Sequence, residues 1–122
     1  MAKKVLIIED NPTDGLIVKE HLLNEDMEVD IAANAKDGIA KAIQMQPDLI
    51  LLDILLPKMQ GDELCKKLKS DDKYKNIPVI LFTASAIRPN LPGEMKAIGA
   101  DDCVLKPFDP EELLGKVKKF IG

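Results

Sequence analysis

Three acidic residues stand directly after the two most apolar runs of the sequence. Glu9 and Asp10 follow Val5-Leu6-Ile7-Ile8, and Asp53 follows Leu49-Ile50-Leu51-Leu52. Runs this uniformly apolar are typical of strands buried on both faces of a parallel sheet, where chemistry gathers beyond the carboxyl ends of the strands. Carboxylates that are held together raise one another's pKa unless a cation relieves the repulsion. The grouping therefore predicts a site for a divalent metal ion.

The elements that must position these acids alternate along the chain. Five short strand-like runs are separated by helical patterns, which favours a doubly wound α/β domain, with five helices distributed over both faces of a parallel sheet. The predicted strands are Lys4–Glu9, Glu28–Ala32, Leu49–Asp53, Pro78–Phe82 and Asp102–Leu105.

Three helix starts are marked by capping residues. Asn11 stands before Pro12, Asp109 stands before Pro110, and Asn34 opens a weaker version of the same pattern. A side-chain cap and a proline at the first helical position both favour the start of a helix.

Apolar residues recur at helical spacing after these starts. We expect the following residues to face the core: Leu16 and Leu23; Ile39, Ala42 and Ile43; Leu64 and Leu68; Leu113, Leu114, Val117 and Ile121. The fourth helix is expected to begin near Leu91 or later and to be short, because Pro89, Pro92 and Gly93 disfavour a helix over the preceding segment.

The composition excludes several classes of protein. A chain of 122 residues with 46% hydrophobic content suits one domain. Its 17 basic and 21 acidic residues give a formal charge of −4, so we expect no direct binding to nucleic acid. No apolar segment approaches the roughly 20 residues that cross a bilayer, so we expect a cytoplasmic protein without membrane insertion. Cys65 and Cys103 form no Cys-x-x-Cys motif, and we expect both to be packing residues.

Further motifs follow the strands in order. A loop with Pro57 and Gly61 comes after Asp53, Thr83-Ala84 follows the fourth strand, and Lys106-Pro107-Phe108 follows the fifth. With these motifs in this order, the chain resembles a receiver domain of the two-component response regulators and is similar to the stand-alone chemotaxis regulators.

The resemblance covers residues 4–121 and implies a single receiver domain over residues 1–122. It implies a flavodoxin-like fold with strand order 2-1-3-4-5. Asp53 would be the nucleophile that accepts a phosphoryl group from the phosphohistidine of a histidine kinase or phosphotransfer protein. The protein would then be a signalling phosphoacceptor rather than an enzyme in the usual sense, although it would catalyse its own phosphotransfer and slow dephosphorylation.

The resemblance also implies Mg²⁺ as the cofactor. Its ligands would be Glu9, Asp10, Asp53 and the backbone carbonyl of Leu55. Magnesium is a hard cation that takes carboxylates, water and substrate phosphate, and it would neutralise charge as the phosphoryl group is transferred.

Three more residues receive roles from the resemblance. Lys106 would place a positive charge on the phosphoryl oxygens, and Thr83 would donate a hydroxyl hydrogen bond to one of them. Pro107 would follow Lys106 in a cis peptide bond, which costs only about 0.5–1 kcal/mol before proline.

The chain departs from the family at positions that matter for switching. Cys103 replaces the Tyr or Phe that family members commonly carry three residues before Lys106, so we expect the signal to depend on the loop after Thr83. Leu55 and Ser85 occupy places that tune the lifetime of the phosphoryl group, and the apolar Leu55 predicts slow self-dephosphorylation. A downstream protein would dock on the face formed by the fourth helix, the fifth strand and the fifth helix.

Other functions remain open at this stage. A haloacid-dehalogenase-type phosphohydrolase also uses a strand-terminal Asp with Mg²⁺, but it needs a second Asp where this chain has Leu55. A nucleotide or flavin binder is disfavoured because no glycine-rich phosphate loop follows a strand. A pseudo-receiver that binds partners without phosphorylation is disfavoured, because all five expected positions are filled. A complete single-domain regulator and a receiver cut from a larger regulator or hybrid kinase are both compatible with the sequence.

Overall fold

The computed structural model describes residues 2–53, 61–84, 99–106 and 109–121. They form a five-stranded sheet in the order β2-β1-β3-β4-β5, and every neighbouring pair is parallel. The strands are β1 Lys4–Ile8, β2 Glu28–Ala32, β3 Leu49–Leu52, β4 Val79–Ala84 and β5 Asp102–Lys106. The predicted fold class and strand order are confirmed, and each predicted strand is present to within two residues at its ends.

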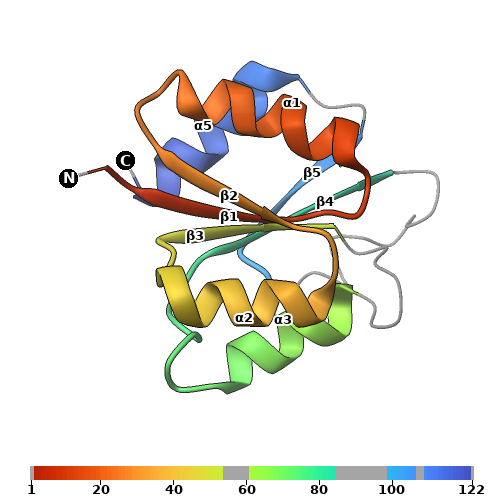
Figure 1. Ribbon diagram of the computed structural model, residues 1–122, viewed down its shortest axis with the longest axis vertical. Helices are drawn as coiled ribbons and strands as arrows, with labels where there is room; N and C mark the ends of the chain where they lie inside the picture. The colour runs from red at the N-terminus through yellow and green to blue at the C-terminus, as the bar shows by residue number, and fades with distance from the viewer. Residues whose placement is uncertain (1, 54–60, 85–98, 107–108, 122) are drawn as a thin grey trace.

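Helices cover both faces of the sheet. They are α1 Pro12–Leu23, α2 Ala35–Met45, α3 Gly61–Ser70 and α5 Pro110–Ile121. Figure 1 shows α1 and α5 side by side over one face, and α2 and α3 over the opposite face. Four of the five predicted helices are thus present among the described residues. The segment predicted to hold the fourth helix, residues 85–98, lies outside them.

The two faces of the sheet build two separate apolar clusters. Val5 and Ile7 of β1 pack with α1 and α5, whereas Leu6 and Ile8 of the same strand pack with α2 and α3. All four residues of β3 are buried, and they divide between the clusters in the same alternation. Because successive side chains of a strand point to opposite faces, a strand covered on both sides must be apolar throughout. This explains the two uniform runs in the sequence.

The predicted helix caps are confirmed. The side chain of Asn11 accepts hydrogen bonds from the backbone N–H groups of Thr13 and Asp14, at 2.9 and 3.2 Å. Asn34 accepts one from the N–H of Asp37 at 2.8 Å. Near the carboxyl end of the chain, the Asp109 carboxylate accepts one from the N–H of Glu111 at 2.9 Å. Each cap fixes where its helix leaves the preceding strand or loop.

The expected core face of α1 is wrong. Leu16 and Leu23 are 54% and 46% exposed, and the helix instead buries Gly15, Val18 and Leu22. Apolar residues surround this helix almost evenly, so their spacing fits more than one face. The glycine decides between the faces, because the helix lies against the side chain of Ile31 at that position.

A similar correction applies to α2. Ile43 is 58% exposed, while Ala42 is buried and Ile39 is partly buried as expected. The helix approaches β1 so closely that a Cβ at Gly38 would lie 2.6 Å from Cδ1 of Ile8. Small residues therefore line the contact, and the larger isoleucine faces outward.

The expected faces of α3 and α5 are largely confirmed. Leu64, Leu68, Leu113 and Val117 are buried, and the other α5 positions are partly buried. Among the described residues, no helix has both the length and the apolar character needed to cross a membrane.

Candidate functional site

The backbone ladder of the sheet continues one residue beyond two of its strands. The N–H of Asp53 donates to the carbonyl of Ile8 at 3.0 Å, and the N–H of Glu9 donates to the carbonyl of Ala32 at 2.9 Å. Because these bonds join neighbouring parallel strands, the first residues after β1 and β3 are held at the same level. The acids are therefore placed by rigid main chain rather than by a free loop.

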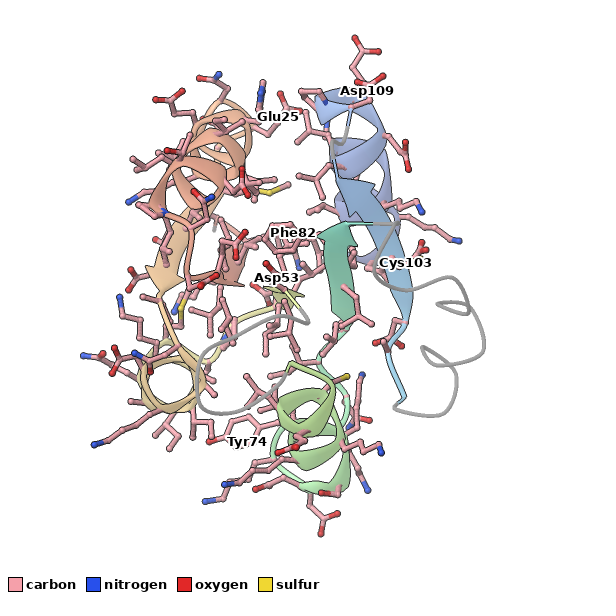
Figure 2. All side chains as sticks on the ribbon, turned by 90° about the vertical axis from the view of Figure 1, so that its right-hand side faces the viewer. Glu25, Asp53, Tyr74, Phe82, Cys103 and Asp109 are labelled. Atoms are coloured by element: carbon pink, nitrogen blue, oxygen red, sulfur yellow. The ribbon has the colours of Figure 1, made fainter. Side chains whose placement is uncertain are left out.

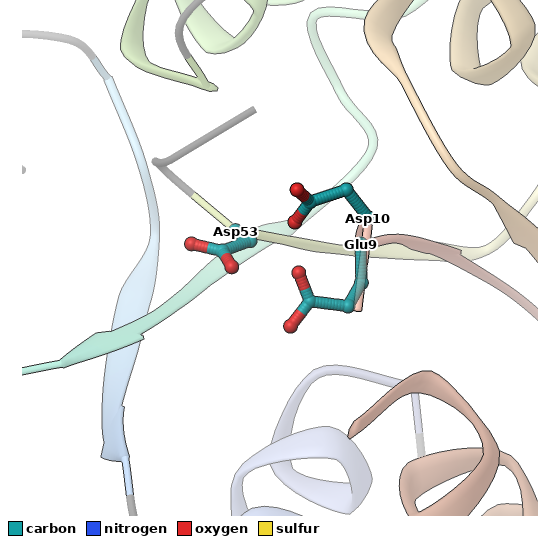
Figure 3. Close-up of side chains that lie close together, drawn as sticks. All are labelled: Glu9, Asp10 and Asp53. Carbon is teal, nitrogen blue, oxygen red and sulfur yellow. The ribbon is translucent and has the colours of Figure 1, made fainter. Parts of the chain in front are cut away.

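The carboxylates of Glu9, Asp10 and Asp53 gather at this end of the sheet. Their nearest oxygens all lie within 4.8 Å of one another. Figure 3 shows the three side chains close together at the ends of β1 and β3, with Glu9 and Asp10 extending toward the side on which Asp53 lies. The sequence prediction that these three acids converge is confirmed.

The three carboxylates differ in their access to water. Glu9 and Asp53 are only 1% and 5% exposed, whereas Asp10 is exposed. Burying carboxylates close together is costly unless a cation or hydrogen-bond donors compensate their charge. An all-oxygen donor set that is open on one side suits Mg²⁺, which binds through a few carboxylates and keeps several waters. The residues present therefore fit the expected metal.

Thr83 and Lys106 lie at the carboxyl ends of their strands, which is the end of the sheet that carries the acids. Ala84 pairs with Lys106 at the carboxyl ends of β4 and β5. Within the sheet, Leu81 of β4 pairs with Leu52, the last residue of β3. The backbone thus carries the expected threonine and lysine on the two strands that lie beyond the buried acid. Leu55, Ser85 and Pro107 fall outside the described residues.

The match to known families agrees with this geometry. The model of the response regulator receiver domain matches residues 5–118, which is nearly the whole chain. The chain belongs to the response regulator receiver family. Its function is therefore that of a receiver domain of two-component response regulators.

Individual relatives include both regulators and kinases. The chain is 39% identical, over 97% of its length, to the DNA-binding dual master transcriptional regulator RpaA of Synechocystis, of which it covers 48%. It is 41% identical, over 93% of its length, to hybrid signal transduction histidine kinase D of Dictyostelium discoideum, of which it covers 7%. The chain thus spans about half or less of the length of these curated relatives.

A solved structure of similar size has the same fold. The chemotaxis response regulator CheY4 of Vibrio cholerae superimposes with a TM-score of 0.90 at 32% identity, covering 98% of this chain and 99% of that chain. The expected receiver fold is thereby confirmed over almost the whole sequence.

Cys103 lies apart from Asp53, as Figure 2 shows, with β4 between its strand and β3. It is partly buried and packs against the cluster that contains Cys65, so both cysteines are packing residues as expected. Burial raises the pKa of the Cys103 thiol above its ordinary 9.0, opposed by Lys116 and assisted by Asp102 and Glu112. The thiol is therefore protonated near neutral pH and is a poor nucleophile.

Gly38 also positions the site, although its role was not predicted from the sequence. Gly38 allows α2 to contact the side chain of Ile8, the residue immediately before Glu9, and this contact supports the carboxyl end of β1. A glycine inside a helical pattern was the available signal, because it costs helix stability and so often marks a close approach.

Proposed function

We propose that Asp53 accepts a phosphoryl group from the phosphohistidine of a histidine kinase or phosphotransfer protein, in a reaction that depends on Mg²⁺. The observation that carries this proposal is the buried Asp53 carboxylate, whose oxygen lies within 4.8 Å of carboxylate oxygens of Glu9 and Asp10. Membership of the receiver family supports the same assignment.

The proposed chemistry is a nucleophilic substitution at phosphorus. An ionised oxygen of Asp53 attacks the phosphoryl group and forms a P–O bond. The P–N bond breaks, its electron pair stays on the ring nitrogen, and the histidine leaves as neutral imidazole because its other ring nitrogen already carries a proton. Bound Mg²⁺, with Glu9, Asp10, Asp53 and the Leu55 carbonyl as its proposed ligands, would neutralise the charge of the transferring group. Glu9 and Asp10 would hold the metal at the end of β1, and its positive charge would favour the ionised form of Asp53 that attacks the phosphoryl group.

Thr83 and Lys106 are proposed to hold the phosphoryl oxygens. Thr83 lies near the carboxyl end of β4, which pairs with β3, and Lys106 ends β5, which pairs with β4, so both are at the end of the sheet where a group bound to Asp53 would lie. The lysine would supply a point charge and the threonine a hydroxyl donor. Pro107 is proposed to set the path of the chain after the lysine, and Ser85 to border the phosphoryl group.

The consequence of phosphorylation is proposed to be a change in partner binding. The downstream protein would dock on the face that includes β5 and α5, in the cytoplasm, and residues 1–122 would act as one receiver unit. Slow self-dephosphorylation is proposed because Leu55 has no polar group to orient an attacking water. Replacing Leu55 by Asn should then shorten the lifetime of the phosphoryl group.

Intact-mass spectrometry after incubation with acetyl phosphate and Mg²⁺ tests the proposal. We expect one added phosphoryl group on the wild-type protein when the sample is kept mildly acidic and measured promptly. The addition should be lost in Asp53→Asn and in a sample treated with a chelator. Asp72→Asn is the matched control, because Asp72 is exposed and pairs with the exposed Lys75 in the turn after α3.

Two results would contradict the proposal. Phosphorylation of Asp53→Asn at the wild-type level would place the acceptor elsewhere. A wild-type protein that takes no phosphoryl group from acetyl phosphate or from a phosphorylated histidine phosphotransfer domain would instead be a pseudo-receiver that acts by binding alone.

A further inference from the structure

Among the described residues, no strand pairs with the outer side of β2 or of β5, so these two strands form the edges of the sheet. The outer side of an edge strand presents backbone N–H and C=O groups that can pair with another strand and so lead to aggregation. A strand of a second chain that paired with these groups would extend the sheet. In this structure, both edges carry the same arrangement of side chains.

At the β2 edge, an aspartate and a lysine cap one outward-facing residue. The main-chain groups of Glu28 and Ala32 point toward the β1 side. The N–H of Glu28 donates to the carbonyl of Lys3, and the carbonyl of Ala32 accepts from the N–H of Glu9. The main-chain N–H and C=O groups alternate in direction from one residue to the next along a strand. Those of Ile31 must therefore point away from β1, toward the open side of β2.

Both outward groups of Ile31 are occupied by side chains. Its N–H donates to Oδ1 of Asp30 at 2.8 Å, and its carbonyl accepts from Nζ of Lys41 at 2.8 Å. The same Nζ donates to Oδ1 of Asp30 at 2.9 Å, which closes a ring of three interactions. Burial acts to raise the pKa of Asp30, but the hydrogen bonds from Lys41 and Ile31 and the lysine charge lower it below its ordinary 3.8, so the carboxylate is ionised at neutral pH.

The β5 edge repeats this arrangement with different residues. The N–H of Cys103 donates to Oδ1 of Asp102 at 2.8 Å, and its carbonyl accepts from Nζ of Lys116 at 2.6 Å. Lys116 also contacts Oδ1 of Asp102 at 3.2 Å. In both cases an aspartate on the edge strand precedes the capped residue, and the lysine comes from the helix that follows in the chain.

The two rings do not share a helix or a face of the sheet. Lys41 belongs to α2 and Lys116 to α5, and these helices lie on opposite sides of the sheet (Figure 1). The same ring of aspartate, lysine and main-chain groups therefore occurs twice, formed by separate parts of the sequence. Such a repetition favours a role that the two edges have in common.

We propose that the Asp30–Lys41 and Asp102–Lys116 rings are clips that prevent a second copy of this chain from adding a strand to either edge of the sheet. An added strand needs a free N–H and a free C=O at alternate residues, and each clip occupies both groups of one such residue. Each clip also places an ion pair where a neighbouring strand would have to lie, so pairing would require desolvation of both charges. Regulated association of this receiver must then use side-chain surfaces and leave the sheet unchanged.

The test removes the lysine ammonium groups and measures association. Methionine keeps much of the aliphatic length of lysine but cannot donate to the carbonyls of Ile31 and Cys103. The double variant Lys41→Met/Lys116→Met should form oligomers that bind thioflavin T, at a level several-fold above the wild type in light scattering. The control double variant Lys36→Met/Lys66→Met loses the same two charges, from −4 to −6, at exposed positions outside the clips and should behave as the wild type does.

Single variants and arginine variants keep the test decisive. Lys116→Met opens one edge and should give dimers beyond the wild-type level but no longer assemblies. Lys41→Arg/Lys116→Arg keeps donors at both sites and should stay at the wild-type level. The proposal is overturned if the folded methionine double variant associates no more than its control. It is also overturned if the arginine variant associates as strongly as the methionine variant, since packing and not the clip would then be responsible.

Discussion

The two ends of the sheet use acidic residues in opposite ways. At the amino ends of the strands, Asp101 accepts hydrogen bonds from the N–H of Val79 and from Nζ of Lys69, each at 2.8 Å. At the carboxyl ends, the oxygens of Glu9, Asp10 and Asp53 lie within 4.8 Å of one another. The first arrangement satisfies donors and stabilises the fold, whereas the second concentrates negative charge and prepares a site for a cation. Location within a parallel sheet thus decides whether an acid serves stability or chemistry.

The largest effect on stability is expected from Asp101→Ala at the amino ends. The substitution removes the acceptor that the N–H of Val79 and the ammonium of Lys69 share. Lys69 keeps its hydrogen bond to the carbonyl of Ile77. We expect a loss of about 2–3 kcal/mol in the free energy of unfolding, measured by urea denaturation. Mg²⁺-dependent phosphorylation should remain within about twofold of the wild type wherever the variant is folded.

A stable Asp101→Ala variant would break the comparison between the two ends. Unchanged stability would mean that the bonds to Val79 and Lys69 are replaced by water at no cost. Asp72→Ala is the matched control, because the Asp72 carboxylate is exposed and pairs with the exposed Lys75. An exposed pair of this kind contributes about 0–1 kcal/mol.

An intermediate effect is expected from Gly38→Ala, which acts on the packing beneath the carboxyl ends. The added methyl would lie 2.6 Å from Cδ1 of Ile8 and would push α2 away from β1. We expect a loss of about 1–3 kcal/mol and weaker Mg²⁺ binding, because Ile8 precedes Glu9. Urea denaturation and a Mg²⁺ titration followed by NMR would measure the two effects.

Gly115→Ala provides the control for this prediction. In the described part of the chain, no atom beyond the two adjacent residues and the local helix backbone lies within 4 Å of a Cβ built at Gly115. Alanine is favoured over glycine in a helix interior by about 1 kcal/mol, so this variant should be more stable than the wild type. If both glycine variants were more stable than the wild type, helix propensity would outweigh the contact with Ile8 and the prediction for Gly38→Ala would be wrong.

The same contrast explains how much of the molecule the sequence predicts. The apolar runs before Glu9 and Asp53 follow from burial on both faces, which is a local property of each strand, and they locate the site correctly. The exposed Leu16 and Ile43 were placed wrongly, because the decision depends on small residues that contact another element. The role of Asp101 depends on donors far along the chain, and no spacing in the sequence indicates it.

The smallest effect is expected from Asp53→Ala in buffer without divalent metal, and its sign should be opposite to that of Asp101→Ala. Removing one carboxylate from the group formed with Glu9 and Asp10 relieves repulsion between ionised side chains, of which two are buried. We expect a gain of about 1 kcal/mol, partly offset by the small cavity that the shorter side chain leaves. Added Mg²⁺ should make the wild type the more stable of the two proteins. At a concentration of about 100 times its Kd, Mg²⁺ should stabilise the wild type by about 2.7 kcal/mol, and the variant by much less. Thermal denaturation with and without Mg²⁺ would measure both differences. A variant that is less stable than the wild type without metal would show that Asp53 contributes to stability as Asp101 does, and the distinction between the two ends would then concern geometry alone.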